Sequence, residues 1–270
     1  MTDRGAGPLL VLVPGIQGRW EWMAPAVDAL AARCRVVTDS LPGDAGSIAG
    51  TDPEVGFECH TKWIDALLDR AHIRGRVALC GVSYGGWIAL HYAAARPERV
   101  GTLTLVSTPS PTWRPGCNVN RYLAAPRLMS PVFALGSPFR LYPEIAAAFP
   151  APGARARFIA GHLDRVLRHP FAPTLMAERV RFAGRMDFTA DCARIAAPTQ
   201  IVTGDPGLDR VVEVESTREY LRAIPGARYD RIERTGHIGL VTRPERFADA
   251  VTQFVASQAA ATAAPLRVPA

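Results

Sequence analysis

The segment from Val77 to Leu90 places a serine between two glycines, in the pattern Gly-x-Ser-x-Gly. Apolar residues before Ser83 fit a buried strand, and those after it recur at helical spacing. A serine at such a sharp strand-to-helix turn projects beyond the strand end, where the first amides of the helix point. Gly81 and Gly85 let the strand and the helix approach closely. The pattern therefore predicts a nucleophile at Ser83 rather than an incidental serine in a glycine-rich turn.

A serine hydroxyl is a weak nucleophile and needs a histidine base, which an acidic residue must orient. Of the six histidines, only His237 follows the later apolar strands, in the glycine-flanked loop TGHIG. We expect His60 and His72 on the surface, and His91 packed within the helix that follows the serine. The base is therefore predicted to be His237.

Two carboxylates follow the apolar run TQIVTG and are candidates for the orienting acid. Asp205 lies nearest the strand end, which favours it on position alone. Pro206 and Gly207 form a turn that would swing Asp209 back toward His237. We choose Asp209 and expect Asp205 to bond nearby backbone amides, while the loop length leaves Asp205 as the alternative.

The turn PGIQG follows the first apolar run and has a use in the same chemistry. A negative oxygen that forms during acyl transfer is held by two backbone N–H groups. We assign one to Tyr84, directly after the serine, and the other to Ile16, with Gln17 as the alternative. The turn lacks the Gly-x-Gly-x-x-Gly pattern, so no nicotinamide cofactor is expected. Neither an HExxH motif nor a Cys/His cluster is present in the sequence, so no metal is expected.

The elements that must position these residues alternate between strand and helix patterns. This alternation predicts an α/β fold with a doubly wound, mainly parallel sheet of about six strands and helices on both faces. Strands are expected near 9–13, 35–39, 76–80, 100–107, 198–204 and 227–233, with helices near 22–32, 57–71, 84–95, 214–224 and 244–257.

The alternation stops between residues 109 and 195, where the sequence is rich in Pro, Ala and Arg. We predict an inserted helical cap there, a core made of residues 1–108 and 196–258, and a disordered tail at 259–270. Several apolar side chains of the insertion are candidates to line a substrate pocket: Leu128, Met129, Val132, Phe133, Phe139, Leu141 and Phe149.

Composition narrows the choice of partners. The net charge is +6, but Lys62 is the only lysine and the arginines are scattered, so no nucleic-acid partner is expected. Five widely spaced cysteines form no CxxC pair, which favours reduced thiols and a cytoplasmic location. No leader or membrane span is apparent, and no membrane partner is expected. The expected partner is a small ester-like molecule, and the oligomeric state stays open.

Four segments together resemble the α/β-hydrolase superfamily over almost the whole chain: LVLVPGIQG, GVSYGG, IVTGDPGLDRVV and TGHIG. The resemblance implies a triad of Ser83, Asp209 and His237. In that family the acid is commonly followed by one variable residue and an apolar pair, which Arg210, Val211 and Val212 supply. Pro14 stands where many members carry a histidine.

One departure from the family concerns the sheet. Members usually have two strands before the oxyanion strand, and eight residues are too few to supply both. We therefore expect all strands of this sheet to be parallel.

The resemblance implies a serine hydrolase that cleaves a carboxylic ester of a small or medium, largely apolar substrate through an acyl-enzyme on Ser83. Lactonases, thioesterases and C–C bond hydrolases use the same triad and stay open as alternatives. A non-catalytic small-molecule receptor on the same scaffold is the alternative from another class. Turnover of a short-chain p-nitrophenyl ester would separate an enzyme from a receptor.

Overall fold

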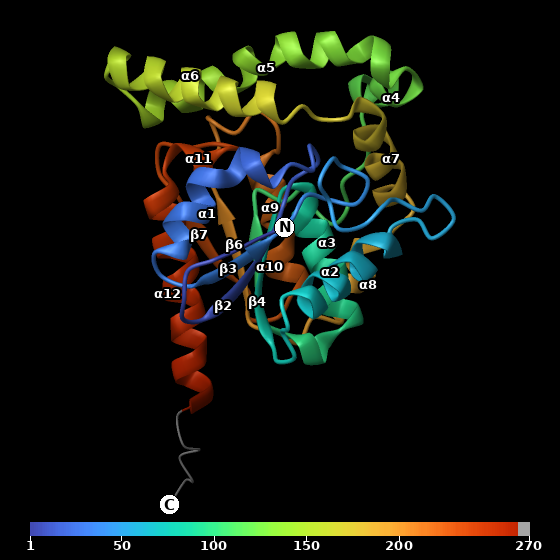
Figure 1. Ribbon diagram of the computed structural model, residues 1–270, viewed down its shortest axis with the longest axis vertical. Helices are drawn as coiled ribbons and strands as arrows, with labels where there is room; N and C mark the ends of the chain where they lie inside the picture. Colours follow the sequence, from blue (N-terminus) through green and yellow to red (C-terminus); the bar gives the residue numbers. More distant parts are fainter. Residues whose placement is uncertain (264–270) are drawn as a thin grey trace, which may run out of the picture.

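Seven strands form one sheet in the computed structural model, which describes residues 1–263 (Figure 1). Their order across the sheet is β1-β3-β2-β4-β5-β6-β7, and every neighbouring pair except β1–β3 is parallel. The strands are β1 (Thr2–Arg4), β2 (Leu9–Val13), β3 (Arg35–Thr38), β4 (Val77–Val82), β5 (Val100–Val106), β6 (Thr199–Thr203) and β7 (Arg228–Arg231).

The expected sheet of parallel strands is confirmed in its six main members, and the expectation that all strands are parallel is wrong. β1 pairs antiparallel with β3, with Thr2 opposite Thr38. Gly5 and Gly7 both have positive φ, which lets the chain reverse between β1 and β2 within four residues. Eight residues are too few for two strands, but they suffice for one short edge strand and a turn.

Helices cover both faces of the sheet, as a doubly wound architecture requires. The helices are η1 (Trp20–Met23), α1 (Ala24–Ala31), α2 (Glu58–Arg70), α3 (Tyr84–Ala95), η2 (Pro97–Arg99), α4 (Cys117–Ala124), α5 (Pro126–Ala148), α6 (Pro152–Arg168), α7 (Pro173–Ala183), α8 (Phe188–Ala193), α9 (Val214–Thr217), α10 (Glu219–Ala223), α11 (Gly239–Thr242) and α12 (Pro244–Ala263).

Alternation along the central strands divides the core between the two faces. In β2, Val11 and Val13 point to the face covered by α2 and α3, whereas Leu10 and Leu12 point to the face covered by α1 and α12. Strands β2 and β4 are buried on both faces, which explains why they read as continuous apolar runs in the sequence.

The insertion between β5 and β6 is helical as expected, but its helices differ in how they join the rest of the molecule. α4, α5 and α6 lie together along one end of the molecule (Figure 1). Leu128, Val132 and Phe139 of α5, which we expected to line a pocket, are instead exposed.

By contrast, α7 and α8 belong to the main core. Phe182 and Ala183 of α7, and Phe188 and Cys192 of α8, are buried in the same apolar cluster as α2 and α3. The division of the chain at 109–195 into an independent cap thus stays a prediction, because the last two inserted helices share the core.

The C-terminal helix is longer than its pattern indicated. α12 continues to Ala263, so residues 259–263, which we expected to be disordered, are helical. The rest of the predicted tail, residues 264–270, lies outside the described residues.

Candidate active site

The strand β4 and the helix α3 meet at Ser83 in the tight turn that the sequence predicts. Ser83 has φ 54° and ψ −120°, a conformation that L residues adopt only when the surrounding structure enforces it. A Cβ at Gly81 would overlap the Gly85 carbonyl, and a Cβ at Gly85 would overlap the Pro14 carbonyl. Both glycines are therefore required for the close packing of β4, α3 and the loop after β2.

The loop after β2 lies beside this turn, as expected for a second N–H donor. An added Cβ at Gly15 would stand 3.6 Å from the Ser83 Cβ. Within residues 1–263, the N–H groups of Ile16 and Gln17 donate no hydrogen bond. The first N–H groups of α3 start at Tyr84, so both sources of N–H groups flank the serine.

Asp209 and His237 meet at the carboxyl edge of the sheet. His237 Nδ1 lies 3.3 Å from Asp209 Oδ2, and their side chains are 12% and 1% exposed. The other oxygen of Asp209 accepts the backbone N–H groups of Val211 (2.9 Å) and Val212 (2.8 Å). These bonds fix the carboxylate in the orientation in which it meets the imidazole.

The alternative acid, Asp205, contacts the same loop but not the histidine ring. Its Oδ2 accepts the backbone N–H of Arg234 at 2.7 Å, and its carbonyl accepts the N–H of Leu208 at 2.9 Å. Asp205 therefore ties the acid loop to the histidine loop, the backbone-bonding role expected of it, while Asp209 faces His237.

The contact between Asp209 and His237 shifts the pKa of both side chains. Burial acts to raise the pKa of Asp209, but the adjacent His237 and the two N–H donors outweigh it and lower that pKa below its ordinary value. Burial acts to lower the pKa of His237, and the Asp209 carboxylate outweighs it, so the pKa of His237 is raised. Asp209 is thus ionised at neutral pH and stabilises a positive charge on the imidazole.

Ser83 and His237 lie at the same edge of the sheet, but no hydrogen bond joins them. Ser83 follows β4 and His237 follows β7, in a sheet whose β4 to β7 run parallel. Among residues 1–263, neither Ser83 Oγ nor His237 Nε2 has a hydrogen-bond partner. Such contacts are often long without substrate and tighten when it binds.

Glu144 is a neighbour of the pair that sequence reasoning did not identify. It comes from α5, is fully buried, and its Oε2 accepts the backbone N–H of Ile238 at 3.1 Å. Burial raises the pKa of Glu144 to about 7, against the lowering effect of backbone N–H groups and of His237. Glu144 is the only acidic residue between Glu98 and Asp164, and this isolation was the available signal.

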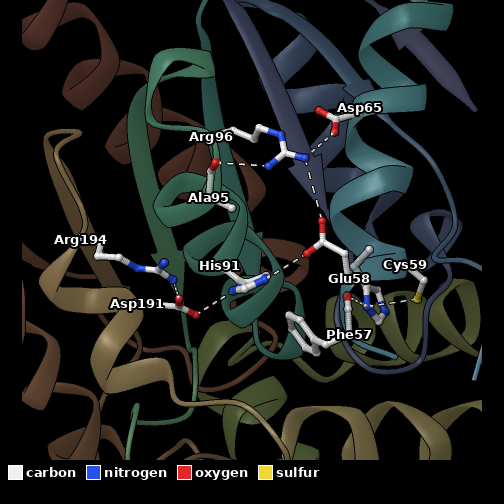
Figure 2. Close-up of polar contacts among 10 residues, drawn as sticks. Phe57, Glu58, Cys59, Asp65, His91, Ala95, Arg96, Asp191 and Arg194 are labelled. Carbon is white, nitrogen blue, oxygen red and sulfur yellow. Dashed lines mark hydrogen bonds and ion pairs between the residues drawn. The ribbon is translucent and has the colours of Figure 1, made fainter. Parts of the chain in front are cut away.

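Three other histidines are placed as follows. His72 is exposed, as expected, whereas the expectation for His60 is wrong. His60 is buried on α2, its Nδ1 lies 3.0 Å from the Phe57 carbonyl, and burial lowers its pKa to about 3. Figure 2 shows His91 packed between Asp191 and Glu58, on the side of α3 that faces α2 and α8.

Within residues 1–263, His, Cys, Asp and Glu side chains form no group of three that could hold a metal ion. Over the same residues, none of the helices is both long enough and apolar enough to cross a bilayer.

Comparison with known proteins gives consistent matches over most of the chain. The Alpha/beta hydrolase family matches residues 10–250. A protein provisionally named carbamate hydrolase RutD, from Caulobacter sp. (strain K31), is 28% identical over 93% of this chain and 91% of its own length. The pimeloyl-[acyl-carrier protein] methyl ester esterase of Nitrosomonas europaea is 24% identical over 90% of this chain and 94% of its own.

The fold also matches solved structures. The crystal structure of a hydrolase from Pseudomonas aeruginosa PA01 superposes with a TM-score of 0.76 at 25% identity. The match covers 94% of this chain and 92% of that chain.

Proposed function

Since the chain belongs to the alpha/beta hydrolase family and its relatives bear hydrolase names, we propose that it is a serine hydrolase that cleaves a carboxylic ester through an acyl-enzyme on Ser83. The observation that carries the proposal is the Asp209–His237 pair at the sheet edge where Ser83 projects from its strained turn. Together these groups supply a nucleophile, a base and an orienting acid.

In the proposed reaction, His237 holds its proton on Nδ1, which donates to Asp209, so Nε2 is free to accept a proton. Ser83 Oγ attacks the ester carbonyl carbon while its proton passes to Nε2. The negative oxygen of the tetrahedral intermediate is held by the N–H groups of Tyr84 and Ile16, with Gln17 as the alternative to Ile16.

The intermediate collapses when its C–O bond to the alcohol breaks, and the imidazolium returns the proton to the departing alkoxide. Water then attacks the acyl-enzyme carbonyl and gives its proton to His237 Nε2. Collapse of the second intermediate releases the carboxylic acid and restores the Ser83 hydroxyl. Asp209 stays ionised throughout and stabilises the imidazolium that forms in each half of the reaction.

Aromatic contacts of the inserted helices support two parts of the proposal: that the acyl group is largely apolar, and that these helices form a cap over the site. Trp22 of η1 packs edge-on against Phe171 and His162, with ring centroids 6.1 and 6.4 Å apart. Phe171 in turn meets Phe133 of α5 at 5.9 Å. Aromatic rings thus continue from the segment after the oxyanion loop into the inserted helices, where an apolar substrate group would be accommodated.

The test combines turnover with covalent labelling. Wild-type protein is expected to hydrolyse p-nitrophenyl esters, and a fluorophosphonate probe is expected to label Ser83, as read by peptide mass spectrometry. Ser83→Ala should lose up to about a million-fold in kcat. Ser107 is a matched control, because it also follows a central strand, is buried and has positive φ; Ser107→Ala should keep most of the activity.

Several outcomes would contradict the proposal. A Ser83→Ala variant that keeps a tenth of the wild-type rate removes the serine from the mechanism. A folded wild type that neither turns over esters, lactones and thioesters nor reacts with the probe indicates a non-catalytic receptor. A panel of these three substrate classes with acyl chains of two to twelve carbons identifies the preferred class.

A further inference from the structure

Arg179 of α7 is a buried guanidinium that reaches the loop carrying the proposed oxyanion donor. Its side chain is 1% exposed. Nη1 donates to the carbonyl of Ile16 at 2.9 Å. Nη2 donates to the carbonyl of Pro42 at 3.1 Å and to the carboxylate of Asp44. One side chain from the insertion therefore joins the loop after β2 to the loop after β3.

Stability alone does not account for this charge pair. The side chain of Asp44 is 2% exposed, so both partners are removed from water. Desolvation of two ions is costly, and apolar residues of similar size often give an equally stable or more stable protein. A buried pair of this kind can instead hold the surrounding backbone in one conformation.

The oxyanion loop is built around the pair. Gly18 has φ +77°, and a Cβ at this position would overlap both the Asp44 carboxylate and the Arg179 guanidinium. The Gly18 carbonyl accepts the N–H of Leu41 at 2.8 Å, which provides a second link to the loop after β3.

The hydrogen bonds fix the two peptide groups that carry the candidate donors. In a trans peptide the carbonyl and the following N–H point in opposite directions, so fixing one fixes the other. The Gly15 carbonyl accepts the Gly18 N–H at 2.9 Å, which orients the N–H of Ile16. Arg179 holds the Ile16 carbonyl, which orients the N–H of Gln17. Both sides of Ile16 are therefore constrained.

We propose that Arg179, held by Asp44, is a positioning residue that fixes the peptide between Ile16 and Gln17, and with it the loop whose N–H groups bind the oxyanion of the tetrahedral intermediate. This inference rests on the proposed serine hydrolase function. Arg179 acts through the loop backbone and does not touch the substrate. Its loss weakens binding of the transition state more than binding of the ground-state ester, and so lowers kcat with little change in KM.

The variants Arg179→Met, Arg179→Lys and Asp44→Asn test this inference with a p-nitrophenyl ester. Loss of one oxyanion donor lowers kcat by about 100-fold or more, so Arg179→Met should lose about 100-fold. Arg179→Lys keeps the charge but loses the planar fork, and it should retain more activity than Arg179→Met. KM should stay within about threefold. Affinity for phenylboronic acid, whose serine adduct carries a tetrahedral oxyanion, should fall in parallel with kcat.

Asp191→Asn is the matched control, because Asp191 is also a buried carboxylate with an arginine partner but lies in α8, where it contacts Arg194 and His91 rather than the loop after β2. It should lower the melting temperature and leave kcat and phenylboronic acid affinity unchanged. Hydrogen–deuterium exchange of the Gly18 and Leu41 amides, which donate to the carbonyls of Gly15 and Gly18, supplies a readout without turnover: exchange should rise in Arg179→Lys and Asp44→Asn but not in Asp191→Asn.

The outcomes separate the inference from the proposed function. If wild-type protein reacts at Ser83, but Arg179→Lys and Asp44→Asn lower only the melting temperature and leave kcat and loop exchange unchanged, the positioning role is wrong. If wild-type protein neither turns over esters nor reacts with the probe, the proposed function fails, and unchanged loop exchange in these variants would also overturn the anchoring of the loop. Arg179→Lys and Asp44→Asn keep the test decisive if Arg179→Met does not fold.

Discussion

Within residues 1–263, two histidines contact an aspartate, and their surroundings differ. His237 meets Asp209 at 3.3 Å in the loops beyond β6 and β7, whereas His91 meets Asp191 at 2.9 Å between α3 and α8. The second nitrogen of His237 is free, but that of His91 faces Glu58 at 3.4 Å. Figure 2 shows that Arg96 and Arg194 extend the His91 contacts into a charged network.

The difference teaches that a close His–Asp contact does not by itself indicate a catalytic base. The His91 pair is the shorter of the two, yet both of its nitrogens are used to hold α2, α3 and α8 together. A general base needs one free nitrogen directed at its nucleophile. His237 has the free nitrogen, and it lies at the sheet edge from which Ser83 projects.

The largest expected effect is on turnover and concerns the Asp209–His237 pair. Asp209→Asn should lower kcat by about four orders of magnitude, because the amide no longer fixes the tautomer and orientation of His237. Initial rates with a short p-nitrophenyl ester measure the loss. Asp205→Asn is the matched control and should cost stability more than rate. The opposite result would assign the role of acid to Asp205.

The second effect is on stability and concerns the His91–Asp191 pair. Asp191→Asn should lower the free energy of unfolding by about 2 kcal/mol, because a buried carboxylate loses charged hydrogen bonds to His91 and Arg194. Urea unfolding followed by circular dichroism measures it. A large loss of kcat in this folded variant would show that the His91 pair contributes to catalysis.

The third effect is on the pH dependence of kcat/KM. His237 must be unprotonated to act as a base, and its pKa is raised above 6.5, chiefly by Asp209 acting against burial. The rate should therefore fall on the acid side with a midpoint above pH 6.5. The negative charge of Glu144 also acts to raise the pKa of His237, so Glu144→Gln should move the midpoint to lower pH. A midpoint that His91→Asn moves and Glu144→Gln does not would contradict this assignment.

The smallest effect is a pH-dependent contribution of His91 to stability. Burial acts to lower the pKa of His91, but Asp191 and Glu58 outweigh it and raise that pKa above 6.5. The stabilising contribution is thus fully present below pH 6.5 and is lost as the pH rises through the raised pKa. It should amount to less than about 1 kcal/mol, because Glu58 is partly exposed.

Melting temperatures at pH 6 and pH 9 measure this contribution. The difference between the two should be smaller in His91→Asn than in wild-type protein. Arg96 and Arg194 flank the same carboxylates and keep their charge over this range, so they do not produce the difference. An equal difference in both proteins would show that another group accounts for it.

The inserted segment shows where sequence patterns fail. The apolar residues of α5 and those of α7 and α8 look alike in the sequence, yet Leu128 and Phe139 are exposed while Phe182 and Phe188 are buried in the core. A helical pattern shows which residues share a face but not whether another element covers that face. His60 was misplaced for the same reason, since burial of its face depends on contacts with α3 and α7.

Local chemistry in the sequence by itself determined the strand-to-helix turn at Ser83, the parallel strands and the order of the three proposed triad residues. Glycine spacing and apolar periodicity act over a few residues, so they can be read without a fold. The sequence favoured Asp209 and left Asp205 open, and only the tertiary structure shows that Asp209 meets His237 and that Glu144 and Arg179 reach the two loops of the site. These contacts join residues 28 to 163 positions apart, and their partners are set by how helices pack on the sheet, which no local pattern records.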